Sequence, residues 1–172
     1  MKSCRAVLFV LGLGITTARE AIATDWWLVP AGPDGPGDAM VYVDKSSMRR
    51  TRGTGIVNAT TWIFHRQEQA SEFGSYRSER ARMTLNCETR EAGADSGSLL
   101  NAFGGVVHRY KSDTAPMKPI DGRSTDAVMA TFMCSDGKQP PRSLPVYDPA
   151  RDVDQRFLQL DRERGASAVP AR

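Results

Sequence analysis

The chain of 172 residues carries 23 Lys and Arg against 20 Asp and Glu, a formal charge of +3, together with three cysteines. Its length fits one domain with a modest tail, and its composition excludes collagen-like, coiled-coil and multi-span membrane proteins. The charge is too small to indicate a dedicated nucleic-acid-binding protein, so no nucleic-acid partner is expected.

The N-terminal segment has the three parts of a secretory signal peptide. Two basic residues precede an apolar run at residues 6–15, and an Ala-Ile-Ala cleavage site ends at Ala23. We expect residues 1–23 to be removed before Thr24; the alternative is a buried N-terminal helix. The apolar run is too short to cross a bilayer, and Cys4 lies before it rather than at the cleavage position. The sequence therefore predicts an exported protein, periplasmic or secreted, with no membrane anchor.

Removal of that segment leaves two cysteines, Cys87 and Cys134. In an oxidising compartment such a pair most simply forms a disulfide. By the loop-entropy relation, closing this loop stabilises the fold by about 4 kcal/mol. Leu, Ile, Val and Phe are scarce in the rest of the chain, so we expect a small core that depends partly on the cross-link.

Five segments have the composition or the alternation of β-strands. The clearest alternation lies in residues 76–89, where one set of side chains is expected to face the core and the other the solvent. The inner set is Ala81, Met83, Leu85 and Cys87, and the outer set is Arg80, Arg82, Thr84 and Asn86. The five expected strands are residues 25–29, 39–45, 56–66, 76–89 and 98–111, the last bent or bulged near Gly104 and Gly105.

Two segments have helical spacing. Ser124 or Thr125 can cap a helix that ends at Cys134, and its apolar stripe consists of Val128, Met129, Phe132 and Met133. A disulfide to Cys87 would attach this helix to the inner face of the sheet. A second helix is expected over residues 148–164, with a thin apolar stripe of Val153, Phe157 and Leu160 that could contact the domain.

These elements predict an α+β fold, in which an antiparallel sheet of about five or six strands packs against one C-terminal helix tied by a disulfide. The domain is expected to span residues 24–138. Residues 139–172 are expected to form a Pro-rich linker, a short helix and a disordered C-terminal tail.

The order of several short motifs resembles the surface-adhesin protein E-like family of bacterial exported proteins over residues 24–136. The motifs are Tyr42-Val43-Asp44 with Ser46, Ser47 and Arg49, then Trp62, Ser75, Ser78 and Asn86-Cys87, and finally Pro119-Ile120, Gly122, Ser124 and Cys134. The resemblance implies a small antiparallel sheet with one helix near its C-terminus. It also implies, from an adhesin member, a surface role in binding host extracellular-matrix proteins, plasma proteins and heparin-like chains.

The densest basic cluster, at residues 48–52, is the candidate binding site. Its Arg49, Arg50 and Arg52 could bind a sulfated glycan or another acidic ligand, because guanidinium groups match the geometry of sulfate. Three further arginines on an exposed sheet face could extend it: Arg80, Arg82 and Arg90. The alternative is a solvated turn between two strands.

Other candidate chemistry is weaker. His65 and His108 with the two cysteines have the composition of a Cys2His2 zinc site but not its compact spacing, so no metal or cofactor is expected. No catalytic motif occurs, and we expect no enzymatic activity. The three tryptophans could line a ligand surface or pack in the core: Trp26, Trp27 and Trp62.

The sequence thus favours a non-enzymatic, adhesin-like binding protein, with a host matrix protein or a sulfated glycan as partner. The alternative is a periplasmic protein with a structural or envelope-maintenance role and no adhesive activity.

Overall fold

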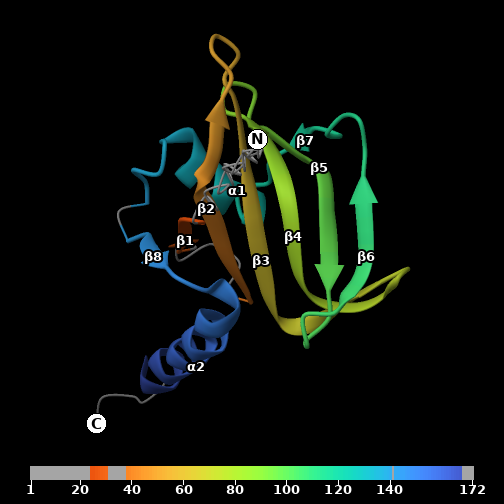
Figure 1. The fold of residues 1–172 in the computed structure, drawn as a ribbon. Helices are drawn as coiled ribbons and strands as arrows, with labels where there is room; N and C mark the ends of the chain where they lie inside the picture. The colour runs from red at the N-terminus through yellow and green to blue at the C-terminus, as the bar shows by residue number, and fades with distance from the viewer. Residues whose placement is uncertain (1–23, 31–37, 141, 168–172) are drawn as a thin grey trace, which may run out of the picture.

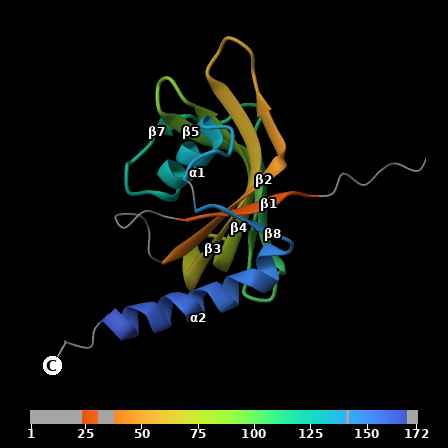
Figure 2. The ribbon, with the colours of Figure 1, turned by 90° about the vertical axis from the view of Figure 1, so that its left-hand side faces the viewer.

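A twisted antiparallel sheet with a helix against each face makes up the fold (Figures 1 and 2). The computed structural model describes residues 24–30, 38–140 and 142–167, the last five of these as backbone only. Helix α1 is Thr125–Cys134 and helix α2 is Pro149–Ser167. The expected signal peptide, its cleavage site and the last residues of the expected tail lie outside the described residues.

Within the described residues the sheet has eight strands, in the order β6-β5-β4-β3-β2-β1-β8, with β7 pairing with the start of β5. The prediction of five or six strands was therefore too low, and the sheet dominates the fold. Both expected helices are present, but the second one also packs against the sheet instead of lying only in a C-terminal tail. The strands are β1 Trp26–Val29, β2 Ala39–Arg50, β3 Ile56–Ser71, β4 Gly74–Asn86, β5 Glu91–Leu100, β6 Val106–Lys111, β7 Lys118–Pro119 and β8 Leu144–Val146.

The main core lies between α1 and one face of the sheet. The predicted alternation of β4 is confirmed, because Ala81, Met83 and Leu85 are buried on this face. Helix α1 contributes its predicted apolar stripe, and Ser124 caps its first turn by accepting a hydrogen bond from the Ala127 N–H at 3.3 Å.

A second core lies between α2 and the opposite face. Val153 and Phe157 of α2 contact an aromatic and aliphatic cluster that includes Tyr42 and Phe64, as the apolar stripe of the sequence predicted. The Tyr42 hydroxyl donates a hydrogen bond to Asp152 at 3.1 Å, and burial raises the pKa of this phenol, so it remains a donor. Two ion pairs add to the contact, Arg66–Asp161 and Arg77–Asp154.

Strands β7 and β8 and the first part of β5 lie where the sequence indicated no strand. The expected strand at 98–111 is in fact the end of β5 and all of β6, joined by a turn. Strand β5 contains glycines because its neighbours approach closely. A Cβ at Gly93 would lie 2.8 Å from the Pro116 carbonyl oxygen, and one at Gly97 would lie 2.5 Å from the Tyr110 hydroxyl oxygen. The segment expected to be a linker contains β8, which pairs with β1 through Leu144, Pro145 and Val146. Proline usually argues against a strand, so Pro145 led to the prediction of a linker here. A short strand at the edge of a sheet tolerates proline.

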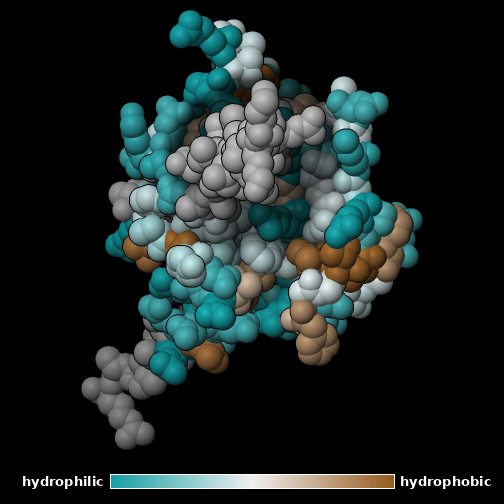
Figure 3. Space-filling model, in the orientation of Figure 1, coloured by the Kyte–Doolittle hydropathy of each residue, from teal (hydrophilic) through white to brown (hydrophobic). Residues whose placement is uncertain are grey.

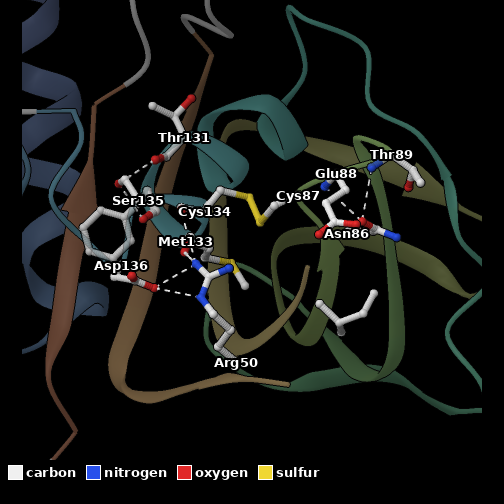
Figure 4. Close-up of a disulfide and its surroundings, with 12 residues drawn as sticks. Arg50, Asn86, Cys87, Glu88, Thr89, Thr131, Met133, Cys134, Ser135 and Asp136 are labelled. Carbon is white, nitrogen blue, oxygen red and sulfur yellow. Dashed lines mark hydrogen bonds and ion pairs between the residues drawn. A yellow bond between two sulfur atoms is a disulfide. The ribbon is translucent and has the colours of Figure 1, made fainter. Parts of the chain in front are cut away.

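The predicted disulfide is present and connects the end of α1 to the end of β4 (Figure 4). Cys87 follows the last residue of β4, Cys134 is the last residue of α1, and their Cα atoms are 5.7 Å apart. Cys87 packs against the main core, on the inner face predicted for it.

Candidate functional site

The three arginines predicted as a binding cluster lie in three different environments. Arg50 reaches the C-terminal end of α1, where its guanidinium donates to the Met133 and Cys134 carbonyls and pairs with Asp136 at 2.8 Å (Figure 4). This positive group complements the negative end of the helix dipole. Arg49 lies on the last exposed part of β2, and Arg52 lies in the exposed β2–β3 turn. The structure does not bring the three together as one site.

We expect Arg50→Ala to lower the free energy of unfolding by about 1 kcal/mol, because the helix end loses its cationic cap and its ion pair. Urea denaturation followed by circular dichroism measures this change. Arg52→Ala removes the same charge from a turn and is the matched control, with a change near zero. Equal effects of the two variants would show that Arg50 does not stabilise α1.

Between Asp44 and Arg49, strand β2 bulges away from β3. Asp44 pairs with Thr60 and Arg49 with Asn58, so the four residues between them on β2 face a single residue of β3. The buried Asp44 carboxylate accepts hydrogen bonds from the N–H of Asp25 and from the N–H and hydroxyl of Ser46. Polar side chains of the bulge itself therefore hold it in place. Asp44 and Ser46 both belong to the first motif named in the sequence analysis.

A pocket of about 390 Å³ opens beside this bulge, on the sheet face opposite α1. Arg49 stands at its rim, fixed by two hydrogen bonds from its guanidinium to the Ser46 and Met48 carbonyls at 2.8 and 2.7 Å. Apart from Ala59, the residues that line it are of polar or charged types: Thr24, Asp44, Ser46, Ser47, Arg49, Asn58, Thr60 and Arg82. Hydroxyl, amide and guanidinium groups of this kind suit a ligand with many oxygen atoms.

Cationic side chains continue from this pocket across the same face. Two adjacent rows run across β4, β5 and β6. The first consists of Arg82, Ser96 and Lys111, and the second of Arg80, Ser98 and Arg109. Residues directly opposite in an antiparallel sheet share a face, so these cations share the face of the pocket. We call Arg49, Arg80, Arg82, Arg109 and Lys111 the basic face; all five are exposed.

Two features organise the basic face. Arg80 stacks against two indole rings, with its guanidinium carbon 5.5 Å from the ring centres of both Trp26 and Trp62. Arg82 lies 3.5 Å from the Asp95 carboxylate, its ion-pair partner. Figure 3 shows this side of the molecule, with hydrophilic residues over much of β4–β6. The sequence had suggested Arg80 and Arg82, but it had missed Arg109 and Lys111, whose contribution depends on the pairing of β6 with β5.

Comparison with known proteins places this architecture in a family. The family model described as surface-adhesin protein E matches residues 26–135, well over half of the chain. The chain belongs to the surface-adhesin protein E family. This confirms the resemblance seen in the sequence and supports a general adhesin-like role at the cell surface. No curated protein and no solved structure matched the chain.

The surface-adhesin protein E match begins at β1 and ends just after α1, so it contains the basic face but neither β8 nor α2. None of the helices in the described part of the chain is long and apolar enough to cross a membrane.

The other sequence candidates are dispersed over this surface-adhesin protein E domain. His65 is on β3, His108 is on β6, and the cysteines are bonded to each other. Burial lowers the pKa of His65 and favours its neutral form. No group of three His, Cys, Asp or Glu side chains among the described residues could hold a metal ion. Arg90 lies in the β4–β5 turn, beside the disulfide.

The tryptophans divide between core and surface. Trp26 is 4% exposed and belongs to the core under α2, and the Trp27 ring lies 6.2 Å from that of Phe132 in α1. Trp62 is partly exposed, next to Arg80.

Tyr110 and Asp126 are partly buried titratable groups on the α1 side of the sheet, and they are not part of the basic face. The Tyr110 hydroxyl donates to Glu79 at 2.7 Å, and burial together with this bond raises its pKa. Burial also raises the pKa of Asp126, and the nearby Glu79 carboxylate adds to this shift.

Proposed function

We propose that this protein is an exported, non-enzymatic adhesin that binds sulfated glycan chains on its basic face. The observation that carries the proposal is that five exposed cations from β2, β4 and β6 share one face of the sheet, four of them in two adjacent rows. Family membership supports the adhesin-like role in general, and the chemistry of this face supports the class of ligand.

The dimensions of the basic face suit a linear polyanion. Neighbouring strands lie about 4.8 Å apart, so the cations from β2 to β6 span about 19 Å. Guanidinium groups bind sulfate oxygens through two parallel hydrogen bonds. Ser96 and Ser98 lie between the cations and add hydroxyl groups that can bond to sugar oxygens.

Two measurements test this proposal. The first is the salt concentration at which the protein elutes from immobilised heparin, and the second is the Kd for heparin. Each exposed charge contact contributes up to about 1 kcal/mol, so we expect Arg80→Ala/Arg82→Ala to weaken binding by about 30-fold. The control is Arg151→Ala/Arg162→Ala, which removes the same charge from exposed positions on α2. The control should bind like the wild type.

Equal losses in both double variants would mean that only net charge matters, and the basic face would not be the site. Competition by a desulfated chain as strong as by heparin would contradict recognition of sulfate. Competition by DNA at the same concentration of negative charge would show a non-selective polyanion surface. If the Arg80→Ala/Arg82→Ala variant bound a host matrix protein as strongly as the wild type does, the binding site for that protein would lie elsewhere on the molecule.

A further inference from the structure

One end of the sheet carries exposed apolar side chains on two neighbouring turns. Phe73 in the β3–β4 turn is 48% exposed, Phe103 in the β5–β6 turn is 98% exposed and Val106 at the start of β6 is 47% exposed. The turns meet at this end, because the Phe73 ring stacks on the His108 ring of β6. Figures 1 and 3 show the turns and apolar residues at the lower ends of β5 and β6. We call Phe73, Phe103 and Val106 the apolar tip.

Both turns are held by internal hydrogen bonds that leave the phenylalanine side chains outside. The Asn101 side-chain oxygen accepts from the N–H of Phe103 and of Gly105, and the Gly104 N–H donates to the Asn101 carbonyl. In the other turn the Ser71 hydroxyl oxygen accepts from the Phe73 N–H. Backbone groups that are satisfied in this way can leave water at low cost.

The tip is too small for a stable protein interface. A single aromatic side chain buries at most about 250 Å², and a standard protein–protein interface takes about 800 Å² from each partner. Three side chains on two turns fall short of that area. Binding to a lipid surface has no such minimum area, because its strength is the sum of apolar burial and electrostatic attraction to anionic lipid.

Cations lie next to the tip. Arg80 and Arg109 of the basic face lie on either side of Ser98, two residues before the end of β5. Arg77 also follows the β3–β4 turn, but its charge is paired with Asp154. Positive side chains flanking an apolar tip complement a negatively charged lipid surface. Glu72, beside Phe73, opposes this attraction.

We propose that the apolar tip inserts into the interface of a bilayer that contains anionic phospholipid, with the adjacent arginines against the headgroups. This attaches the protein peripherally to a membrane surface. The inference does not rest on glycan binding, because the three apolar side chains that insert are not part of the basic face. The two proposals share only the flanking Arg80 and Arg109.

Flotation with vesicles of phosphatidylglycerol and phosphatidylcholine, compared with phosphatidylcholine alone, tests the proposal. All variants are purified from cells in the same form as the wild type, so that any contribution of the rest of the chain to vesicle binding is the same in each. We expect the wild type to bind the anionic vesicles. Phe103→Ser should weaken this binding about tenfold, because the side chain loses its burial in lipid. Tyr147→Ser, at a residue that is 99% exposed before α2, is the matched control and should bind like the wild type.

A second variant tests the electrostatic part. Glu72→Gln should strengthen binding about fivefold at low salt, because it removes the negative charge beside the tip. At 0.5 M salt this gain should disappear while the loss in Phe103→Ser persists, since screening acts on charges and not on apolar burial. Arg80→Ala/Arg82→Ala should lose heparin retention more than vesicle binding, which separates the two proposals. Absence of vesicle binding, or equal binding by wild type and Phe103→Ser, would overturn the inference.

Discussion

Replacing Cys87 with Ser is expected to lower the free energy of unfolding by about 2–5 kcal/mol, and Cys134→Ser by a similar amount. Both changes break the same bond, which closes a loop with a sequence separation of 47 residues. Without the bond the unfolded chain gains the conformational freedom of that loop, and the end of α1 is no longer tied to β4. Urea denaturation of the oxidised protein measures the change.

Reduced wild-type protein is the control for these variants. A reductant should destabilise the wild type to the level of Cys87→Ser and should leave the variant unchanged. Two free thiols in the oxidised wild type, or a stability unaffected by reduction, would contradict the prediction. Because Arg50 binds the same helix end, its effect and that of the disulfide should not be additive.

Phe132→Ala is expected to lower the free energy of unfolding by about 3–5 kcal/mol. Phe132 is fully buried between α1 and the sheet, with its ring next to Trp27. A Cβ placed on Gly137 would lie only 3.2 Å from the edge of this ring, which shows how closely the turn after α1 covers it. Alanine leaves a cavity that these neighbours cannot fill, since sheet and helix are both fixed by the disulfide.

Chemical denaturation of Phe132→Ala and Phe132→Leu together checks this prediction. Leucine fills most of the space, so its cost should stay below about 1.5 kcal/mol. Leu158→Ala, on the exposed side of α2, should change stability little. A loss in Phe132→Ala no greater than in Leu158→Ala would show that α1 is not part of the cooperative core.

The sequence predicted the parts of the fold that depend on local pattern. The alternation in β4, the capped helix α1 and the apolar stripe of α2 all follow from side-chain spacing within one element. The disulfide followed from the cysteine count. The first part of β5 was not predicted, because glycine has a low strand propensity. The structure requires a glycine at position 97, because the Tyr110 ring covers this position.

The basic face could be predicted only in part, because it depends on register between distant segments. Arg80 and Arg82 alternate within one strand and were recognised as solvent-facing. Arg109 and Lys111 join them through the pairing of β6 with β5, which no local pattern fixes. Arg50 looked equivalent to Arg49 in the sequence. Its contact with the end of α1 spans more than 80 residues and reassigns it to stability.

The pairing of β8 with β1 sets an order on the assembly of the sheet. A chain emerges from the ribosome with its N-terminus first, so β1 and β2 are available early, whereas β8 is among the last segments to appear. Until then the outer edge of β1 has unpaired backbone groups that could join a strand from another chain. A nascent chain that stops after the family-matched segment therefore has β1 as its exposed edge. The C-terminal extension covers β1 and replaces it at the edge with the short, proline-containing β8.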